Sequence, residues 1–160
     1  MKILFICTHN RCRSILAEAL TRHISAGKID ARSAGSQPAG VVFPGTLTYL
    51  KSQNIPTDGL TSQSWDDHEA FAPDVVITVC DSAAGETCPV WFGQTARVHW
   101  GLPDPSKLPT ETEQQEKFKE VGAMMQQRLA LLASADLDSA MDKSSLEVAI
   151  KQLLVSEQTV

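Results

Sequence analysis

Apolar positions divide the chain into short strand-like runs and longer helical stretches. Residues 2–7 and 74–80 are almost continuously apolar, with many β-branched side chains, which predicts strands buried on both faces. Shorter runs at 31–35 and 97–100 predict two more strands. Helical spacing, capping residues and helix breakers predict helices over 14–26, 46–52, 65–71 and 112–132, and a last one from Ser144 or Ser145, as its cap, to 155. Strands alternating with helices predict an α/β fold with a small four-stranded parallel sheet flanked by helices.

The stretch Cys-Thr-His-Asn-Arg-Cys-Arg-Ser at residues 7–14 joins the first predicted strand to the first helix. Backbone N–H groups converge at such a turn, and the positive end of the helix dipole adds to them. This field holds a tetrahedral oxyanion and should lower the pKa of Cys7, the candidate nucleophile. Arg13 offers two parallel donors to the anion. The residues expected around the oxyanion are Thr8, His9, Asn10, Arg11, Cys12, Arg13 and Ser14.

Composition narrows the class of protein. With 160 residues, 42% of them hydrophobic and 21% charged, the chain suits a compact domain over 1–134 with a helical extension at 135–160, packed on that domain or trailing it. The net charge of −5 argues against a nucleic-acid partner. No apolar run approaches the roughly 18 residues of a membrane span, and no signal peptide is evident, so we expect a cytoplasmic protein without a membrane partner.

The positive charge is concentrated at the start of the chain. Residues 1–40 carry a net charge of +4 and the remainder −9. This distribution favours a small anion near the first loop over an extended polyanion. Arg22, Lys28 and Arg32 are interpreted as solvated surface, and Arg11 either adds positive potential at the mouth of the loop or points to solvent.

Four cysteines, at positions 7, 12, 80 and 88, suggest catalytic or redox chemistry rather than a structural disulfide set. They form no C-x2-C pair, and the four histidines show no zinc spacing, so we expect no metal site. Cys7, Cys80 and Asp104 each lie at or just after a predicted strand end, which places them at one edge of the sheet. Asp104 stands between two prolines and is a candidate general acid, although Asp-Pro is also common in turns. Cys12 is expected to pack in the loop rather than to trap Cys7 as a protective disulfide.

The C-x5-R-S motif of residues 7–14, the two later cysteines and the Asp-Pro pair resemble the arsenate reductase branch of the low-molecular-weight protein tyrosine phosphatase superfamily. The resemblance implies that Cys7 attacks arsenate with Asp104 as the general acid. Cys80 then attacks the Cys7 sulfur and Cys88 attacks Cys80. It further implies re-reduction by external thioredoxin or by glutathione and glutaredoxin, no tightly bound cofactor, and phosphate or sulfate as competing anions.

Further positions match the same superfamily. Asn10 corresponds to an asparagine that braces the loop, and Ser14 is expected to donate to Cys7, to cap the helix, or both. In some members the equivalents of Asn10, Glu18 and Ser33 join an aspartate to hold potassium. Gln63 stands at the aspartate position here, which puts the potassium site in doubt.

Two other functions stay open from the sequence. A low-molecular-weight protein tyrosine phosphatase needs only one cysteine. That branch usually has proline and aromatic residues where this chain has Ile15 and Ser106. A non-catalytic oxyanion or redox sensor would be oxidised without turnover.

Overall fold

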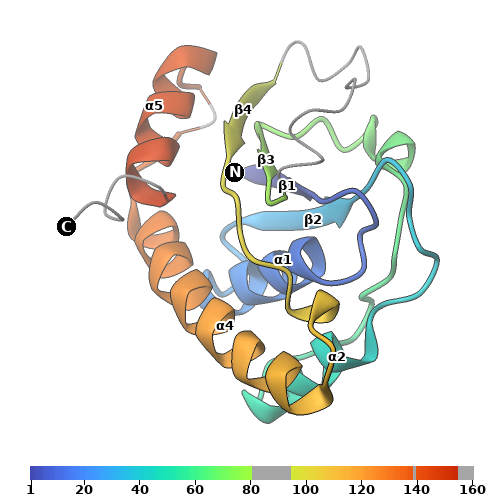
Figure 1. The fold of residues 1–160 in the computed structure, drawn as a ribbon. Coiled ribbons are helices and arrows are strands. Elements are labelled where there is room, and N and C mark those ends of the chain that lie inside the picture. Colours follow the sequence, from blue (N-terminus) through green and yellow to red (C-terminus); the bar gives the residue numbers. More distant parts are fainter. Residues whose placement is uncertain (81–94, 139, 155–160) are drawn as a thin grey trace.

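The computed structural model describes residues 1–80, 95–138 and 140–154. At its centre these residues form a parallel sheet of four strands in the order β2-β1-β3-β4 (Figure 1). The strands are β1 Lys2–Ile6, β2 Asp30–Ala34, β3 Val75–Thr78 and β4 Ala96–His99. The fold class predicted from the alternation of strands and helices is therefore confirmed.

The register brings the carboxyl ends of all four strands to one level. Ile6 lies opposite Ala34 on one side and Thr78 on the other, and Thr78 lies opposite His99. The chain thus leaves the sheet at the same edge after β1, β3 and β4. In parallel sheets this edge is where ligands bind.

Helices pack around this sheet and lie against one another. The helical elements are α1 Arg13–Ile24, α2 Pro44–Ser52, α4 Glu111–Ser134 and α5 Lys143–Leu154, with 3-10 turns η1 Trp65–His68 and η3 Pro105–Lys107. In Figure 1, α4 runs from the foot of α5, past α1, to α2. Where a helix is predicted over 65–71, the structure has only the four-residue 3-10 turn η1. The residues after it form single turn hydrogen bonds, from the N–H groups of Phe71 and Ala72, and no regular helix.

The two central strands carry the core, as their continuous apolar pattern predicts. Leu4 and Phe5 of β1 and Val76 and Ile77 of β3 are completely buried, so both faces of each strand are covered. The edge strand β4 instead alternates buried and exposed positions. Because β1 and β3 are buried on both faces, their positions in the sheet are fixed. The residues that directly follow them, including Cys7 and Cys80, are therefore held at the same edge of the sheet.

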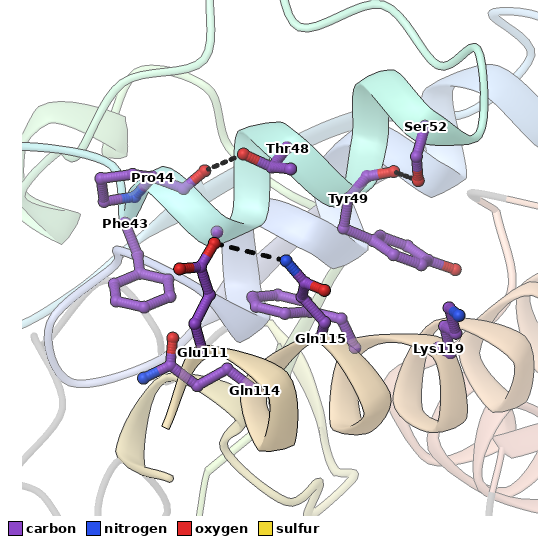
Figure 2. Close-up of a pocket in the computed structure, with 11 residues that line it drawn as sticks. Phe43, Pro44, Thr48, Tyr49, Ser52, Glu111, Gln114, Gln115 and Lys119 are labelled. Atoms are coloured by element: carbon purple, nitrogen blue, oxygen red, sulfur yellow. Dashed lines mark hydrogen bonds between the residues drawn. The ribbon is translucent and has the colours of Figure 1, made fainter. Parts of the chain in front are cut away.

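Aromatic side chains join α2 to α4. Tyr49 stacks on Phe118 with ring centroids 5.8 Å apart, and Phe43 stacks on the same ring at 6.2 Å. Gly122 makes room for this packing, because a Cβ there would come within 2.0 Å of the Tyr49 hydroxyl. A cavity of about 510 Å³ lies between the two helices (Figure 2), and no residue of 7–14 lines it.

The C-terminal helix α5 packs on the edge of the sheet and on α4. It buries Leu146, Ile150 and Leu154, and the Glu147 Oε1 atom accepts a hydrogen bond of 3.0 Å from the Arg97 N–H of β4. The expected cap at Ser144 or Ser145 is wrong. The helix begins at Lys143, and the Asp142 carboxylate, one residue earlier, accepts from the Ser145 N–H at 2.8 Å. The division of the chain at residue 134 stays a prediction.

Candidate active site

The loop after β1 is held from outside through its carbonyl groups. The carbonyl oxygens of Thr8, His9 and Arg11 each accept a hydrogen bond of 2.9 Å, from the N–H groups of Gln37, Ala39 and Phe43. Asn10 adopts a left-handed conformation with φ of 44°, which turns the chain sharply. With its carbonyls fixed to the segment that follows β2, the loop can direct N–H groups to its inner side.

Gly35 allows that segment to approach. A Cβ at position 35 would lie 2.4 Å from the Cys7 carbonyl oxygen and 2.5 Å from that of Thr8, so only glycine fits between them. Gly35 ends the strand predicted over 31–35, and the sequence alone suggests no role for it. Its signal would have been a glycine directly at the end of a strand that neighbours the loop.

Two cysteine sulfurs meet at the inner side of the loop. The Thr8 N–H donates to the Cys80 Sγ atom at 3.4 Å, and the Thr8 hydroxyl lies 3.7 Å from the same sulfur. Cys7 forms a side-chain hydrogen bond with Cys80 and receives one from the His9 N–H. Both thiols are buried and unbridged. The structure therefore brings together the sulfurs at positions 7 and 80, as the strand ends predict, whereas Cys88 lies outside the described residues.

The expected lowering of the Cys7 pKa is wrong for this arrangement. The hydrogen bond with Cys80 and burial both raise the pKa of Cys7, while Arg13 and the His9 N–H act in the opposite direction. The neighbouring Cys80 thiol and the low dielectric of the site both favour the neutral form of Cys7. Together they outweigh the effect of Arg13 and the His9 N–H, which favour the thiolate. Cys7 therefore rests as a thiol.

Arg13 faces Asp104 across the mouth of the loop. Its Nη2 atom lies 3.3 Å from Asp104 Oδ2, both side chains are only 12% exposed, and Nη1 donates to the Leu102 carbonyl at 2.9 Å. The Arg13 Nε atom is buried and has no hydrogen-bond partner among residues 1–80, 95–138 and 140–154. This guanidinium thus keeps one donor available for a further acceptor in the site.

Ser106 connects the acid to the loop. Asp104 Oδ1 accepts from both the N–H and the hydroxyl of Ser106, at 2.9 and 2.6 Å. The same hydroxyl accepts from Arg11 Nη2 at 2.9 Å, and the Arg11 guanidinium lies over the Phe43 ring at 5.2 Å. Arg11 therefore does not point freely into solvent. From the sequence, Ser106 was notable only because phosphatases of this superfamily usually have an aromatic residue at that position.

Cys12 and Ser14 occupy the other side of the loop. Burial raises the pKa of Cys12 to about 12, although a hydrogen bond from the Thr46 side chain lowers it, and this favours the packing interpretation of Cys12. Ser14 does not cap α1, which begins at Arg13 with Cys12 at the N-cap position and no side-chain cap. The Ser14 hydroxyl accepts from Asn10 Nδ2 at 2.8 Å, and its proposed bond to Cys7 stays a prediction.

A buried polar chain lies behind the loop. Asn10 Nδ2 also donates to Ser33 Oγ at 2.9 Å, and Ser33 Oγ donates to Glu18 Oε1 at 2.5 Å. Burial raises the pKa of Glu18, while Ser33 and the guanidinium of Arg22 lower it. Arg22 is exposed over 42% of its side chain, as predicted for solvated surface, but its Nη2 atom also lies 2.7 Å from Glu18 Oε2. The two residues have the i,i+4 spacing that a helix brings together.

The described residues contain neither a metal-binding cluster nor a membrane-spanning helix. No group of three or more His, Cys, Asp or Glu side chains in this part of the chain is arranged to hold a metal ion. Among the helices described, none combines the length and the apolar composition needed to cross a bilayer.

Comparison with known proteins defines the class to which this fold and site belong. The family of low molecular weight phosphotyrosine protein phosphatases matches residues 2–145, so the chain belongs to that family. The match extends well beyond the motif residues 7–14, 80, 88 and 104.

Within the family, the chain is similar to arsenate reductases. It is 33% identical over 132 residues to the arsenate reductase of Halalkalibacterium halodurans, covering 82% of this chain and 94% of that protein. An arsenate reductase solved in its phosphate-binding state matches with a TM-score of 0.69 at 30% identity, over 83% of this chain and 96% of the other. The thioredoxin-dependent arsenate reductase of Corynebacterium glutamicum matches with a TM-score of 0.60 at 30% identity, over 78% and 57% of the two chains. The resemblance noted from the motifs is thereby confirmed.

Proposed function

We propose that this protein reduces arsenate to arsenite through a pair of thiols. The observation that carries the proposal is a second sulfur that the end of β3 brings to the inner side of the loop: Cys80 Sγ accepts the Thr8 N–H at 3.4 Å beside Cys7. Hydrolysis of a phosphate ester needs one cysteine and a water molecule, whereas reduction needs two electrons, which two thiols supply by forming a disulfide. The similarity to arsenate reductases supports the same reaction.

In the first step, the loop N–H groups and Arg13 bind arsenate, with phosphate and sulfate as competitors. Cys7 rests as a thiol, so it releases its proton as its sulfur attacks arsenic. A sulfur–arsenic bond forms, one arsenic–oxygen bond breaks, and the released proton and the departing hydroxyl leave as water. Asp104 is placed to pass that proton, once arsenate takes over the contact that Arg13 makes with it.

In the second step, the Cys80 thiol attacks the Cys7 sulfur. A sulfur–sulfur bond forms and the sulfur–arsenic bond breaks, with its electron pair remaining on arsenic, which becomes As(III). The proton of Cys80 goes to the departing arsenite. Both sulfurs are buried and near each other, so this step demands little movement of β1 or β3.

In the last step, Cys88 attacks Cys80 and passes the disulfide to an external dithiol. Cys88 lies outside the described residues, so its role follows from the resemblance. The thioredoxin dependence of the similar reductase from Corynebacterium glutamicum favours thioredoxin over glutathione with glutaredoxin. Thiol chemistry of this kind suits a reducing compartment, and we propose the cytoplasm.

A phosphatase is the second candidate function, because Cys7, Arg13 and Asp104 suffice for phosphate-ester hydrolysis and the chain belongs to a phosphatase family. The two functions make opposite demands on Cys80. Reduction requires its sulfur, and hydrolysis does not.

The test measures arsenate-dependent oxidation of NADPH with thioredoxin and its reductase, or with glutathione, glutaredoxin and glutathione reductase. We expect Cys7→Ser and Cys80→Ser to lose activity by at least about 100-fold with either system. Cys12→Ser, a buried cysteine of the same loop, is the matched control and should keep activity. Hydrolysis of a phosphate monoester is measured on the same proteins.

Two results would contradict the proposal. One is arsenate reduction that survives Cys80→Ser with both donors. The other is phosphate-ester hydrolysis in a protein that does not oxidise NADPH with either donor. Activity that survives Cys88→Ser with glutathione but not with thioredoxin would keep the first two steps and replace the third.

A further inference from the structure

The buried chain behind the loop has a fixed direction. An amide nitrogen only donates, so Asn10 Nδ2 donates to Ser33 Oγ, and the Ser33 hydroxyl must place its own proton elsewhere. It donates that proton to Glu18 Oε1 at 2.5 Å. The other end of the Asn10 side chain accepts the Gln63 N–H at 2.7 Å. The residue that turns the loop is thus oriented by a chain of hydrogen bonds that ends on the Glu18 carboxylate.

The Arg22 guanidinium determines whether Glu18 can remain a carboxylate at the end of this hydrogen-bond chain. Glu18 is only 5% exposed, and a buried carboxylate is costly unless it is paired. Arg22, one helical turn along α1, lies on its free oxygen at 2.7 Å. The Arg22 Nε atom also donates to the Ala31 carbonyl of β2 at 2.8 Å. Two contacts on different elements therefore fix the guanidinium.

The same residues do not fit the potassium ion held by some members of the family. Gln63 supplies a neutral amide in place of a carboxylate, and both ends of that amide are bonded. Its Nε2 atom donates to the Thr61 hydroxyl at 2.5 Å, and its Oε1 atom lies 2.6 Å from His68 Nε2. The adjoining cavity of about 410 Å³ is lined by two carboxylates, Glu18 and Asp30, and by two arginines, Arg22 and Arg32, whose positive charges offset both carboxylates.

We propose that Arg22 is a positioning residue for the oxyanion loop. Its guanidinium supplies, from within the chain, the positive charge that anchors Glu18, Ser33 and Asn10, so the loop holds its shape without potassium. This inference rests on the proposed function, because it assumes that the loop binds an oxyanion.

The test compares Arg22→Gln with Arg32→Gln as the matched control. Both arginine side chains are 42% exposed and both line the same cavity, but Arg32 contacts Asp30 at 3.9 Å and lies over Phe71 rather than touching the chain behind the loop. Inorganic phosphate is the probe, and its dissociation constant is measured by calorimetry in potassium, sodium or choline chloride at about 100 mM.

We expect the wild-type protein to bind phosphate equally well in the three salts. Arg22→Gln should weaken phosphate binding about tenfold, Arg22→Lys should restore part of the loss, and Arg32→Gln should stay within about twofold of the wild type. Melting temperatures are recorded for each protein. If Arg22→Gln does not fold, Arg22→Lys carries the test, because it keeps the charge but loses the planar contact with Ala31 and should bind less tightly than the wild type.

A double variant separates positioning from a general loss of structure. Arg22→Gln with Gln63→Asp removes the guanidinium and adds a second carboxylate, so potassium, but not choline, should improve its phosphate binding. A purely structural role for Arg22 would give no response that is specific to potassium.

Three outcomes would overturn the inference. They are tighter phosphate binding by the wild type in potassium than in choline, equal affinities of Arg22→Gln and Arg32→Gln, and a double variant that does not respond to potassium. A wild-type protein that binds neither phosphate nor arsenate would overturn the proposed function, and this inference with it. The first three would leave the proposed function standing.

Discussion

Two arginine–carboxylate pairs flank the oxyanion loop, and they differ in what else their members touch. At the mouth, Arg13 and Asp104 are 3.3 Å apart, Asp104 is the N-cap of the 3-10 turn η3, and the Arg13 Nε atom has no partner in the described part of the chain. At the back, Arg22 and Glu18 are 2.7 Å apart on a single helix, and Glu18 continues into a hydrogen-bond chain. The proposed function requires the Arg13–Asp104 pair to separate when an anion binds. It requires the Arg22–Glu18 pair to stay in contact.

The largest effect is expected at the mouth. Arg13→Gln removes a charged donor from the bound oxyanion and should lower kcat/KM for arsenate by about 100- to 1,000-fold. Arg22→Gln should cost only about tenfold. Steady-state NADPH oxidation measures both, with Arg32→Gln as the control. Equal losses at positions 13 and 22 would show that the two pairs do not differ as described.

A second experiment changes the carboxylate of the mouth pair. Asp104→Asn removes a proton donor and acceptor, so kcat should fall roughly 100-fold. It also releases Arg13 from an ionic partner, so phosphate should bind at least as tightly as in the wild type. Stopped-time arsenite assays and calorimetry measure the two quantities. A kcat unchanged by Asp104→Asn, with the exposed Asp58→Asn as the control, would remove Asp104 from the reaction.

A third, smaller effect concerns the thiols between the two pairs. The hydrogen bond with Cys80 is the largest cause of the raised Cys7 pKa, so Cys80→Ala should lower that pKa and increase the thiolate fraction at neutral pH. The rate of alkylation of Cys7 by iodoacetamide at pH 7 should then rise by about tenfold for each unit of pKa decrease. Mass spectrometry of the Cys7 peptide across a pH series follows the reaction. Slower alkylation in Cys80→Ala would reverse the assignment of cause.

The smallest effect is expected at Cys12. This thiol is 2% exposed, and its pKa, raised to about 12, keeps it protonated. Cys12→Ala should leave arsenate turnover within about twofold and reduce the free energy of unfolding by about 1 kcal/mol, measured by urea titration. A large loss of turnover in a folded protein would give Cys12 a chemical role.

The strand–loop–helix unit was predictable because its signals are local. An apolar run, a motif with fixed spacing and a helical pattern follow one another within residues 2–24, and the parallel topology then places Cys80 and Asp104 at the same edge. The pairing of Arg22 with Glu18 follows from their i,i+4 spacing, but its link to the loop was not predictable, because the contacts with Ala31 and Ser33 form only where α1 packs on β2. The raised pKa of Cys7 likewise depends on the position of one sulfur, which no periodicity encodes. The helix cap at Asp142 was missed for a simpler reason, since three neighbouring residues, Asp142, Ser144 and Ser145, are all good caps.

The contact between Glu147 and the Arg97 amide has a consequence for how molecules of this protein meet. A strand at the border of a sheet offers its amides to any extended chain that comes near, and growth of the sheet from one molecule into the next begins there. On β4 a carboxylate from α5 already occupies one of these amides, and the helix stands alongside the strand (Figure 1). A second molecule would have to displace α5 before it could add its own strand. The position of α5 therefore hinders growth of the sheet at β4.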